Sequence, residues 1–404
     1  MISAFSEAYR TNHRSKCYSS KSDAFPFMSL KTDIIIIGGG LAGLTAALHL
    51  QKAGVEVLLV ENHTYPNHKV CGEYVSNEVL PYLKWLGADP EQLNPAVISR
   101  LKFTTISGKS ISTPLPLGGF GISRFMLDNF LYETFVAKGG KVLKDKVISI
   151  KYSQEAFEII TANDIVIFAK HAIGAYGKRS AVDVKLNRSF IQKKSPYLAV
   201  KAHYSGTIEN EVVSLHNFSG GYCGVSSIED QKINICYLAD YSTFSKHKSI
   251  LSYQQQVLYK NKRLEEVMEN SKMLFNQPLT ISQISFDDKE AVVDHMLMIG
   301  DSAGLIHPLC GNGMGMGIHS AKLCAELLIK FCNGTINSRN KLEITYISSW
   351  NSLFRPRLNM GRILSAALEH KSLTNFALKG LMRLPSLLPM IIKRTHGKPL
   401  IINE

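Results

Sequence analysis

Hydrophobic positions are densest over residues 33–61, where two apolar runs flank a segment rich in Ala and Leu. Ile34–Ile37 is a β-branched run, which is typical of a strand buried on both faces of a parallel sheet. Val55–Val60 predicts a second strand of the same kind, and Leu41–Ala53 predicts a helix between the two. Gly54 suits the C-cap of that helix. The pattern therefore predicts a strand–helix–strand unit.

The turn that joins the first strand to the helix carries three glycines, Gly38, Gly40 and Gly43, in the spacing G-x-G-x-x-G. The first permits a tight turn, the second lets the backbone approach a pyrophosphate, and the third lets the helix pack closely on the strand. The helix begins with Leu41 and Ala42, and its N-terminus carries a partial positive charge that attracts phosphate. This turn predicts a phosphate-binding site.

An acidic residue, Glu61, ends the second strand eighteen residues after Gly43. An acid in this place is well positioned to bind the hydroxyl pair of a ribose. Glycines alone are weak evidence, but the two strands, the helix and the terminal acid together predict dinucleotide binding. From this stretch alone, an NAD dehydrogenase is the natural hypothesis.

A loop over residues 62–74 follows the acid, because a proline and a glycine interrupt any regular pattern there. The loop leaves the sheet at the ribose end, so we expect it to lie beside the nucleotide. Lys69, Cys71 and Glu73 are of interest because of that position. The alternative is a solvated loop with one packed cysteine.

The middle of the chain alternates β-type runs with turns. Short runs over residues 100–122 predict an antiparallel excursion from the first domain, and helical spacing follows over Phe125–Lys138. Residues 197–240 predict further strands, Ser249–Met268 predicts a helix, and Leu279–Phe286 predicts another strand. We expect a β-rich second domain packed on the nucleotide domain.

A second glycine-rich segment returns to the architecture of the first. Met296–Ile299 predicts a buried strand, which Asp301 closely follows. Pro308 lies in the next loop, and Gly311–Gly317 opens a helix that extends to about Phe331. Small residues early in this helix let its N-terminal amides approach a ligand closely. A buried strand, an acid, a proline-containing loop and a glycine-rich helix start together indicate a second ligand-binding turn.

The net charge of +13 is concentrated at the two ends of the chain. Residues 1–32 carry +3 and residues 355–404 carry +7, so the rest of the chain carries only +3. This distribution argues against a nucleic-acid groove across the fold and favours a basic terminal surface. Hydrophobic content of 45% and 20% charged residues describe a globular protein.

The seven cysteines are scattered, without a C-x-x-C pair or metal-ligand spacing, at positions 17, 71, 223, 236, 310, 324 and 332. We therefore expect no metal and no disulfide framework, and a reducing compartment such as the cytoplasm. Residues 376–394 mix bulky apolar side chains with spaced cations, but Pro385 and Pro389 forbid one continuous helix. This tail predicts contact with an anionic membrane surface, the alternative being a terminal helix packed on the first domain.

Two distant segments match a known pattern, and over most of residues 33–330 the chain resembles the FAD-dependent oxidoreductases of the p-hydroxybenzoate hydroxylase and geranylgeranyl reductase superfamily. The resemblance implies that the first glycine motif holds the ADP half of FAD. It implies that the acid of the second motif binds the ribityl chain and that the helix start faces the pyrimidine end of the flavin. The second motif maps to Gly300, Asp301, Ala303, Pro308, Gly311 and Gly313. The cofactor-binding residues so implied are Gly38, Gly40, Leu41, Ala42, Gly43, Glu61, Arg124, Asp301, Pro308, Gly311, Asn312, Gly313 and Met314.

The resemblance has one extension and two departures. Lys69-Val-Cys71-Gly72 looks like the Lys-x-Cys-Gly of geranylgeranyl reductases, which places Cys71 near the flavin. The family's Ala-Asp-Gly-x-x-Ser has Tyr176 in place of its acid, which puts the usual NAD(P)H contact in doubt. The segment Gly221–Ser227 lacks the Trp and Pro of the motifs of reductases and flavin halogenases, which argues against halogenation.

The predicted fold class is α/β, with a Rossmann-like FAD-binding domain of the two-dinucleotide-binding type, an interleaved β-rich substrate domain and a C-terminal helical region. We assign residues 31–99, 123–180 and 287–335 to the FAD-binding domain, 100–122 and 181–286 to the substrate domain, and 336–404 to the helical region. Residues 1–30 are expected to be a disordered or non-native extension, since proteins with this motif commonly begin just before the first strand, as Met28 would.

The expected function is a flavoprotein monooxygenase of the hydroxylase or epoxidase type, with NAD(P)H as a transient electron donor. Its expected substrate is an apolar small molecule such as an isoprenoid, a lipid or an aromatic polyketide. One alternative is reduction of an isoprenoid double bond, for which Cys71 and Tyr222 are candidate proton donors. The other is a non-catalytic flavin-binding protein that docks on a partner or membrane.

Overall fold

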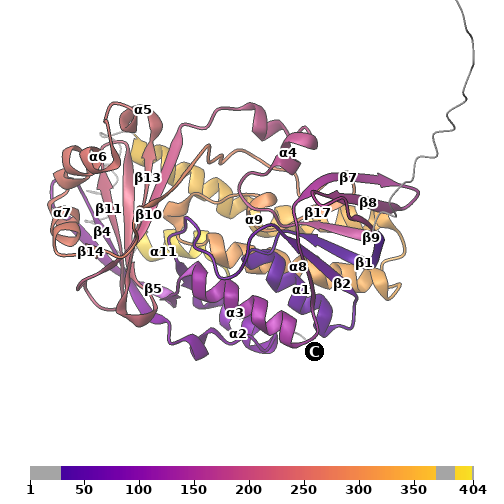
Figure 1. Ribbon diagram of the computed structural model, residues 1–404. Helices are drawn as coiled ribbons and strands as arrows, with labels where there is room; N and C mark the ends of the chain where they lie inside the picture. The colour runs from indigo at the N-terminus through magenta and orange to yellow at the C-terminus, as the bar shows by residue number, and fades with distance from the viewer. Residues whose placement is uncertain (1–28, 370–386, 403–404) are drawn as a thin grey trace, which may run out of the picture.

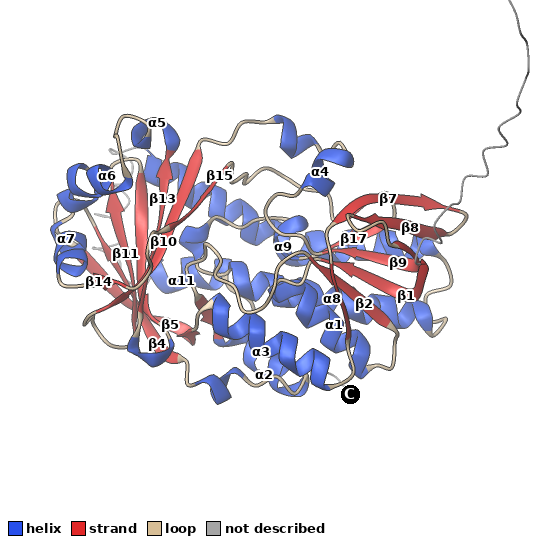
Figure 2. Ribbon diagram, in the orientation of Figure 1, coloured by secondary structure: helices blue, strands red, loops and turns tan. Residues whose placement is uncertain are grey.

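The computed structural model describes residues 29–369 and 387–402. The extension expected at the N-terminus therefore lies outside the described residues, except for the first two residues of strand β1. Two β-sheets stand apart, and helices α1, α3, α8 and α9 lie between them (Figure 1). Figure 2 shows the same layers coloured by secondary structure. The predicted fold class is confirmed, whereas the exact domain boundaries stay a prediction.

The first sheet is mainly parallel and contains the predicted strand–helix–strand unit. Ile34–Ile37 lies in its interior, with Ile34 beside Val57 on one flank and His171 on the other. Burial on both faces explains why this stretch is continuously apolar. In spatial order the strands are β16 (Val292–Val293), β17 (Met296–Met298), β9 (Val166–Gly174), β1 (Ser29–Ile37), β2 (Val57–Glu61) and β6 (Lys141–Lys144), while β8 (Ala156–Thr161) pairs with β9 and β7 (Val147–Ser153) with β8.

The second sheet is mainly antiparallel, and it takes in the strands expected over residues 100–122. The sheet joins early strands of the chain to late ones, because β4 pairs in parallel with β11, which comes much later in the sequence. In spatial order they are β14 (Lys272–Met273), β10 (Tyr197–Ser205), β13 (Ile233–Asp240), β12 (Gly221–Ser227), β11 (Val212–Phe218), β4 (Ala96–Thr104), β5 (Ser110–Gly121) and β3 (Tyr74–Ser76), with β15 (Leu279–Ser282) also on β10.

The helices between the sheets pack on one another, α1 against both α3 and α8, and α8 against α9. Smaller helices lie on the loops that connect the strands, and α5, α6 and α7 flank the second sheet (Figure 1). The helix bounds are α1 (Leu41–Lys52), α2 (Leu80–Trp85), α3 (Arg124–Ala137), α4 (Ala181–Lys185), α5 (Tyr241–Phe244), α6 (Ile250–Gln256), α7 (Lys262–Glu269), α8 (Gly313–Cys332), α9 (Arg339–Glu369) and α11 (Leu387–Thr395).

The continuous helix predicted over Ser249–Met268 is wrong, because the structure divides it into α6 and α7. Asn261 lies between the two helices, and its side-chain oxygen accepts hydrogen bonds from the backbone N–H groups of Arg263 and Leu264. An asparagine that caps a helix in this way starts a new helix. Its amide nitrogen also donates to Thr104 Oγ1 of the second sheet, a partner far away in the sequence.

The C-terminal segment returns to the middle of the molecule, where α11 packs against β5 and α9. Ile392 of α11 joins a buried apolar cluster with Tyr74, Ile98 and Leu115. Pro389 lies in the first turn of α11, where a missing N–H costs little. The first part of the predicted membrane-binding tail, up to residue 386, lies outside the described residues. No helix in residues 29–369 and 387–402 is long and apolar enough to cross a membrane.

Candidate active site

A cavity of about 950 Å³ extends from the first sheet to the second. One end is formed by the β1–α1 turn, and the other by apolar side chains of the second sheet and of α11. Most of the site residues predicted from the sequence line this cavity: Gly38, Gly40, Leu41, Ala42, Glu61, Cys71, Arg124, Tyr222, Asp301, Pro308, Gly311, Gly313 and Met314. Gly43 and Asn312 do not line it, and both have contacts elsewhere in the protein.

The three glycines of the first motif have different surroundings. Gly38 has a φ of 108°, and a Cβ there would lie 2.5 Å from the carbonyl oxygen of Ala175. A Cβ at Gly43 would overlap the carbonyl oxygen of Gly38, so this glycine lets α1 pack on β1. At Gly40 the nearest protein atom would be 3.6 Å away. A Cβ at Gly40 would therefore make only ordinary van der Waals contacts, with the ends of two cationic side chains, and no other backbone among the described residues covers this position, as an approach to a pyrophosphate requires.

Glu61 is held at the end of β2 by two backbone donors. The N–H of Gly39 donates to Oε2 at 2.6 Å, and the N–H of His63 donates to Oε1 at 2.8 Å. Each carboxylate oxygen keeps lone-pair capacity beyond these bonds, and the residue lines the cavity. This arrangement fits a carboxylate that accepts hydrogen bonds from a ribose diol.

Two cations lie beside the N-terminus of α1 and share one carboxylate. Arg124 donates to Asp128 from Nε at 2.6 Å and from Nη2 at 2.7 Å, and Lys69 Nζ donates to the same carboxylate at 3.0 Å. A Cβ at Gly40 would lie 3.6 Å from Lys69 Nζ and 3.7 Å from Arg124 Nη2. Two cations and one acid leave a surplus positive charge at a helix N-terminus, which attracts a diphosphate. The role of Arg124 in binding the cofactor stays a prediction.

A buried network around Glu73 fixes the loop that carries Cys71. Glu73 Oε1 accepts from Lys201 Nζ at 2.7 Å and from the backbone N–H of Arg124 at 2.8 Å, and Oε2 accepts from His203 Nε2 at 2.6 Å. Glu73, Lys201 and His203 are all buried. Burial alone would raise the pKa of Glu73, but the hydrogen bond from His203 and the charge of Lys201 outweigh it and lower that pKa.

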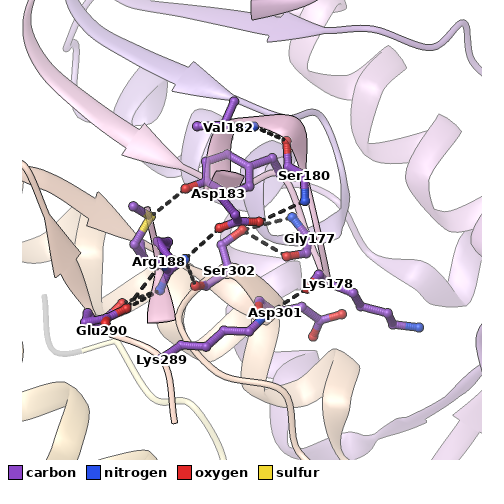
Figure 3. A network of polar contacts seen from close by, with 12 residues as sticks. Gly177, Lys178, Ser180, Val182, Asp183, Arg188, Lys289, Glu290, Asp301 and Ser302 are labelled. Carbon is purple, nitrogen blue, oxygen red and sulfur yellow. Dashed lines mark hydrogen bonds and ion pairs between the residues drawn. The ribbon is translucent and has the colours of Figure 1, made fainter. Parts of the chain in front are cut away.

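The second motif is tied to the segment that follows β9 (Figure 3). Lys289 Nζ donates to the backbone oxygens of Asp301 at 2.7 Å and of Lys178 at 2.9 Å. Burial lowers the pKa of Lys289 to about 8. Ser302 Oγ accepts from the backbone N–H of Gly177 at 2.9 Å. Because these bonds use its backbone, the Asp301 carboxylate lies outside them and lines the cavity.

Arg188 completes this network from the buried side (Figure 3). Its Nη1 donates to Asp183 Oδ1 at 3.0 Å and to the backbone oxygen of Ser302 at 2.8 Å, and its Nη2 donates to the backbone oxygen of Glu290 at 3.0 Å. The family's acid at position 176 is absent here, and the Tyr176 hydroxyl lies 3.4 Å from the sulfur of Met298. The turn therefore keeps its place in the fold through partners other than that acid.

Both candidate proton donors line the same cavity. The backbone oxygen of Cys71 accepts from Asn234 Nδ2 at 3.2 Å, which connects the loop to the second sheet. Tyr222 lies on β12 and is buried, and burial raises the pKa of its hydroxyl well above the ordinary value. Tyr222 therefore stays protonated and able to donate. The catalytic roles of both residues stay a prediction.

The residues at the first-sheet end fit FAD. An open glycine turn and surplus positive charge suit its diphosphate, Glu61 suits its adenosine ribose, and Asp301 suits its ribityl chain. The contacts around Glu73, Lys289 and Arg188 are hard to predict from sequence spacing, because each of these residues has at least one partner more than 100 positions away.

Comparisons with known proteins agree with this geometry. A family model described as FAD binding domain matches residues 31–346. A menaquinone reductase of Mycobacterium tuberculosis is 23% identical over 316 residues, which cover 73% of this chain and 76% of the relative. A ubiquinone hydroxylase of Neisseria meningitidis is 22% identical and covers 75% and 70%. The structure of a flavin-dependent brominase superposes with a TM-score of 0.73 at 16% identity, over 90% of this chain and 93% of the other.

Proposed function

The chain belongs to the FAD binding domain family, and from this premise we propose that it is a flavoprotein monooxygenase of the hydroxylase or epoxidase type. It is an FAD-dependent oxidoreductase, as its hydroxylase and reductase relatives are enzymes of the same family. The non-catalytic alternative is therefore not supported. When bound, FAD supplies the two-electron redox chemistry, with NAD(P)H as the donor and O2 as the co-substrate.

The protein's own residues bind and orient the cofactor. Glu61 accepts from the adenosine ribose, while Arg124 and the start of α1 neutralise the diphosphate. Asp301 would bind the ribityl chain, and the amides at the N-terminus of α8, which begins at Gly313, would stabilise negative charge on the bound cofactor. None of these residues has to move a proton, so their shared task is to hold the flavin against the second part of the cavity.

The observation that carries the proposal is the apolar extension of the cavity beyond the cofactor residues. Its walls are side chains of β4, β5, β11 and β15, including Leu101, Phe103, Ile111, Val213 and Ile281. A hydroxylase must keep water away from its reduced, oxygen-reacting cofactor, and an apolar wall does so. The same wall favours an apolar substrate such as an isoprenoid, a lipid or an aromatic polyketide.

A second candidate function is reduction of an isoprenoid double bond. It is favoured by the two protic side chains, Cys71 and Tyr222, that line the cavity, because double-bond reduction needs a proton as well as a hydride. The menaquinone reductase among the relatives is in line with this alternative. Against it stands the segment Gly221–Ser227, which lacks the Trp and Pro of the reductase motif.

Oxygen consumption distinguishes the two functions. The purified holoprotein is mixed with NADH or NADPH and a candidate isoprenoid or aromatic polyketide, and O2 uptake and product are both measured. A monooxygenase consumes one O2 for each oxygenated product and gives no product under strict anaerobiosis. Anaerobic formation of a saturated product would eliminate the monooxygenase proposal and establish the reductase. A reaction without substrate measures uncoupled oxidation.

We further propose that the C-terminal tail contacts an anionic membrane surface. The support comes from α11, in which Leu387 is 39% exposed and Met390 is 56% exposed, next to the exposed cations Lys393 and Arg394. Exposed apolar residues with adjacent cations suit the interface of a bilayer. The opposite side of α11 lines the cavity through Ile392, so a membrane-bound α11 would lie between the lipid and the substrate site.

A further inference from the structure

A buried carboxylate, Glu78, joins the C-terminal segment to the interior of the protein. The backbone N–H of Gly397 donates to Glu78 Oε2, and the backbone N–H of Leu400 donates to its carbonyl oxygen at 2.8 Å. Asn312 Nδ2 and Arg357 Nη1 each lie 3.4 Å from Glu78 Oε1. A side chain at position 78 thus receives contacts from residues 234 to 319 positions further along the chain.

Asn312 links this carboxylate to the start of α8. It is fully buried and directly precedes Gly313, the first residue of the helix whose N-terminus lines the cavity. Its side chain does not cap that helix, and instead Nδ2 donates to the backbone oxygen of Thr395 at 2.9 Å. The Nδ2 group of Asn312 is thus bonded to the C-terminal segment, and the expectation that Asn312 binds the cofactor stays a prediction.

The network has little free space on either side. A Cβ at Gly397 would lie 2.6 Å from Arg357 Nη2 and 3.0 Å from Glu78 Oε1. On the α8 side, a Cβ at Gly315 would overlap Asn312 Oδ1 and lie 3.0 Å from the same Glu78 oxygen. A displacement of the C-terminal segment would therefore disturb the ends of the Arg357 and Glu78 side chains, and Glu78 connects it to Asn312 in the turn before α8.

We propose that the segment Thr395–Leu400 is a positioning element of the flavin site, and that it sets the turn Gly311–Met314 through Glu78 and Asn312. Gly311, Gly313 and Met314 line the cavity, whereas Glu78 and Asn312 act through them. The segment itself also reaches the cavity, since Thr395 and His396 line its wall. Docking of the C-terminus and binding of FAD are then coupled equilibria, so that each favours the other. This inference rests on FAD occupying the cavity.

Two substitutions test the coupling from opposite sides of the network. Gly397→Ala places a methyl group against the ends of the Arg357 and Glu78 side chains, and Glu78→Gln removes the buried charge. Each is expected to raise the dissociation constant of FAD about tenfold or more and to shift the visible absorption band of the bound flavin. Lys398→Ala is the control, because this exposed residue lies in the same segment and should leave FAD affinity within twofold. If Gly397 and Glu78 only stabilised the fold, the two variants would have a lower midpoint of thermal unfolding but an unchanged flavin spectrum and an unchanged FAD affinity at 20 °C.

The proposal is overturned if both variants fold, as judged by far-UV circular dichroism, and bind FAD within twofold of the native protein. Hydrogen exchange on the unmodified protein gives a test that needs no variant. Addition of FAD should slow exchange of the Gly397 and Leu400 amides at least tenfold, because both donate to Glu78. Unchanged exchange at these amides in a protein that does bind FAD refutes the inference alone, whereas absence of FAD binding in the native protein refutes its premise.

Discussion

Removing the charge of Glu73 should destabilise the protein far more than removing a surface carboxylate. Lys201 and His203 are buried with Glu73, and Lys201 Nζ lies 2.7 Å from its carboxylate. Glu73→Gln leaves the Lys201 ammonium in the interior opposite a neutral amide. An ion deprived of its buried partner costs about 3–5 kcal/mol of folding free energy. The same change at Glu91, whose ion pair with Lys84 is exposed, should cost about 0–1 kcal/mol.

The assay is urea denaturation followed by far-UV circular dichroism, at one fixed concentration of FAD because a bound ligand adds to stability. The double variant Glu73→Gln/Lys201→Met removes both charges, so it should recover most of the loss and come within about 1 kcal/mol of the native protein. Recovery would show that the uncompensated ammonium, and not the lost hydrogen bonds, causes the destabilisation.

The pH dependence gives a second measurement on the same pair. The pKa of Glu73 is lower in the folded protein than its ordinary value of 4.5, so its ionisation contributes stability above pH 4.5 that is lost as pH falls through the folded pKa. The stability gap between native protein and Glu73→Gln should therefore be constant near neutrality and shrink below pH 4.5. A cost under about 1 kcal/mol at pH 7, or a double variant as unstable as the single one, would refute the reasoning.

Three further predictions concern the cofactor and the tail. Gly40→Ala should weaken FAD binding about tenfold or more in a folded protein, because its Cβ has room in the protein but not beside a pyrophosphate. Gly43→Ala should instead impair folding itself. Equal FAD affinity of the native protein and Gly40→Ala would contradict this prediction. Asp301→Ala should weaken FAD binding about 10- to 100-fold with the fold intact, as judged by flavin fluorescence on release, and full retention of FAD would rule out its assignment. Charge reversal at Lys393 and Arg394 should reduce cosedimentation with anionic vesicles about tenfold or more and leave cosedimentation with neutral vesicles unchanged. If the variant binds anionic vesicles as well as the native protein does, and salt does not weaken that binding, the interfacial proposal is excluded.

The part of the fold that binds the cofactor could be predicted because its determinants are local. A stretch of 28 residues contains Ile34–Ile37, the three glycines and Glu61. Each of these positions meets one requirement of a nucleotide-binding strand–turn–helix unit. The strand Met296–Met298 and the turn that follows it repeat this logic. The break between α6 and α7 is not predictable from the sequence, because an asparagine such as Asn261 can be either a helical residue or a cap. Its contact with Thr104, which is distant in the sequence, favours the cap.

The networks around Glu73 and Glu78 could not be predicted, for a different physical reason. Most of their partners lie more than 100 residues away in the sequence, so no spacing in the sequence records them. Nor does the residue type help, because a glutamate is ordinarily exposed. The position of Glu73 close to Cys71, in the loop after Glu61, indicates that the loop lies near the nucleotide but identifies no partner for Glu73.

The two ends of the cavity are therefore specified in different ways. A cofactor of fixed shape requires particular residues at fixed spacing, and these occur in short motifs that a sequence displays. The apolar end requires only that inward-facing positions of several strands be hydrophobic, and many combinations satisfy that requirement. Leu101, Phe103 and Val213 would have been equally acceptable as ordinary core residues, and only the register of β4 with β11 brings them to one wall. Substrate preference can consequently change by substitution along that wall, while the cofactor turns and the buried carboxylates that position them stay as they are.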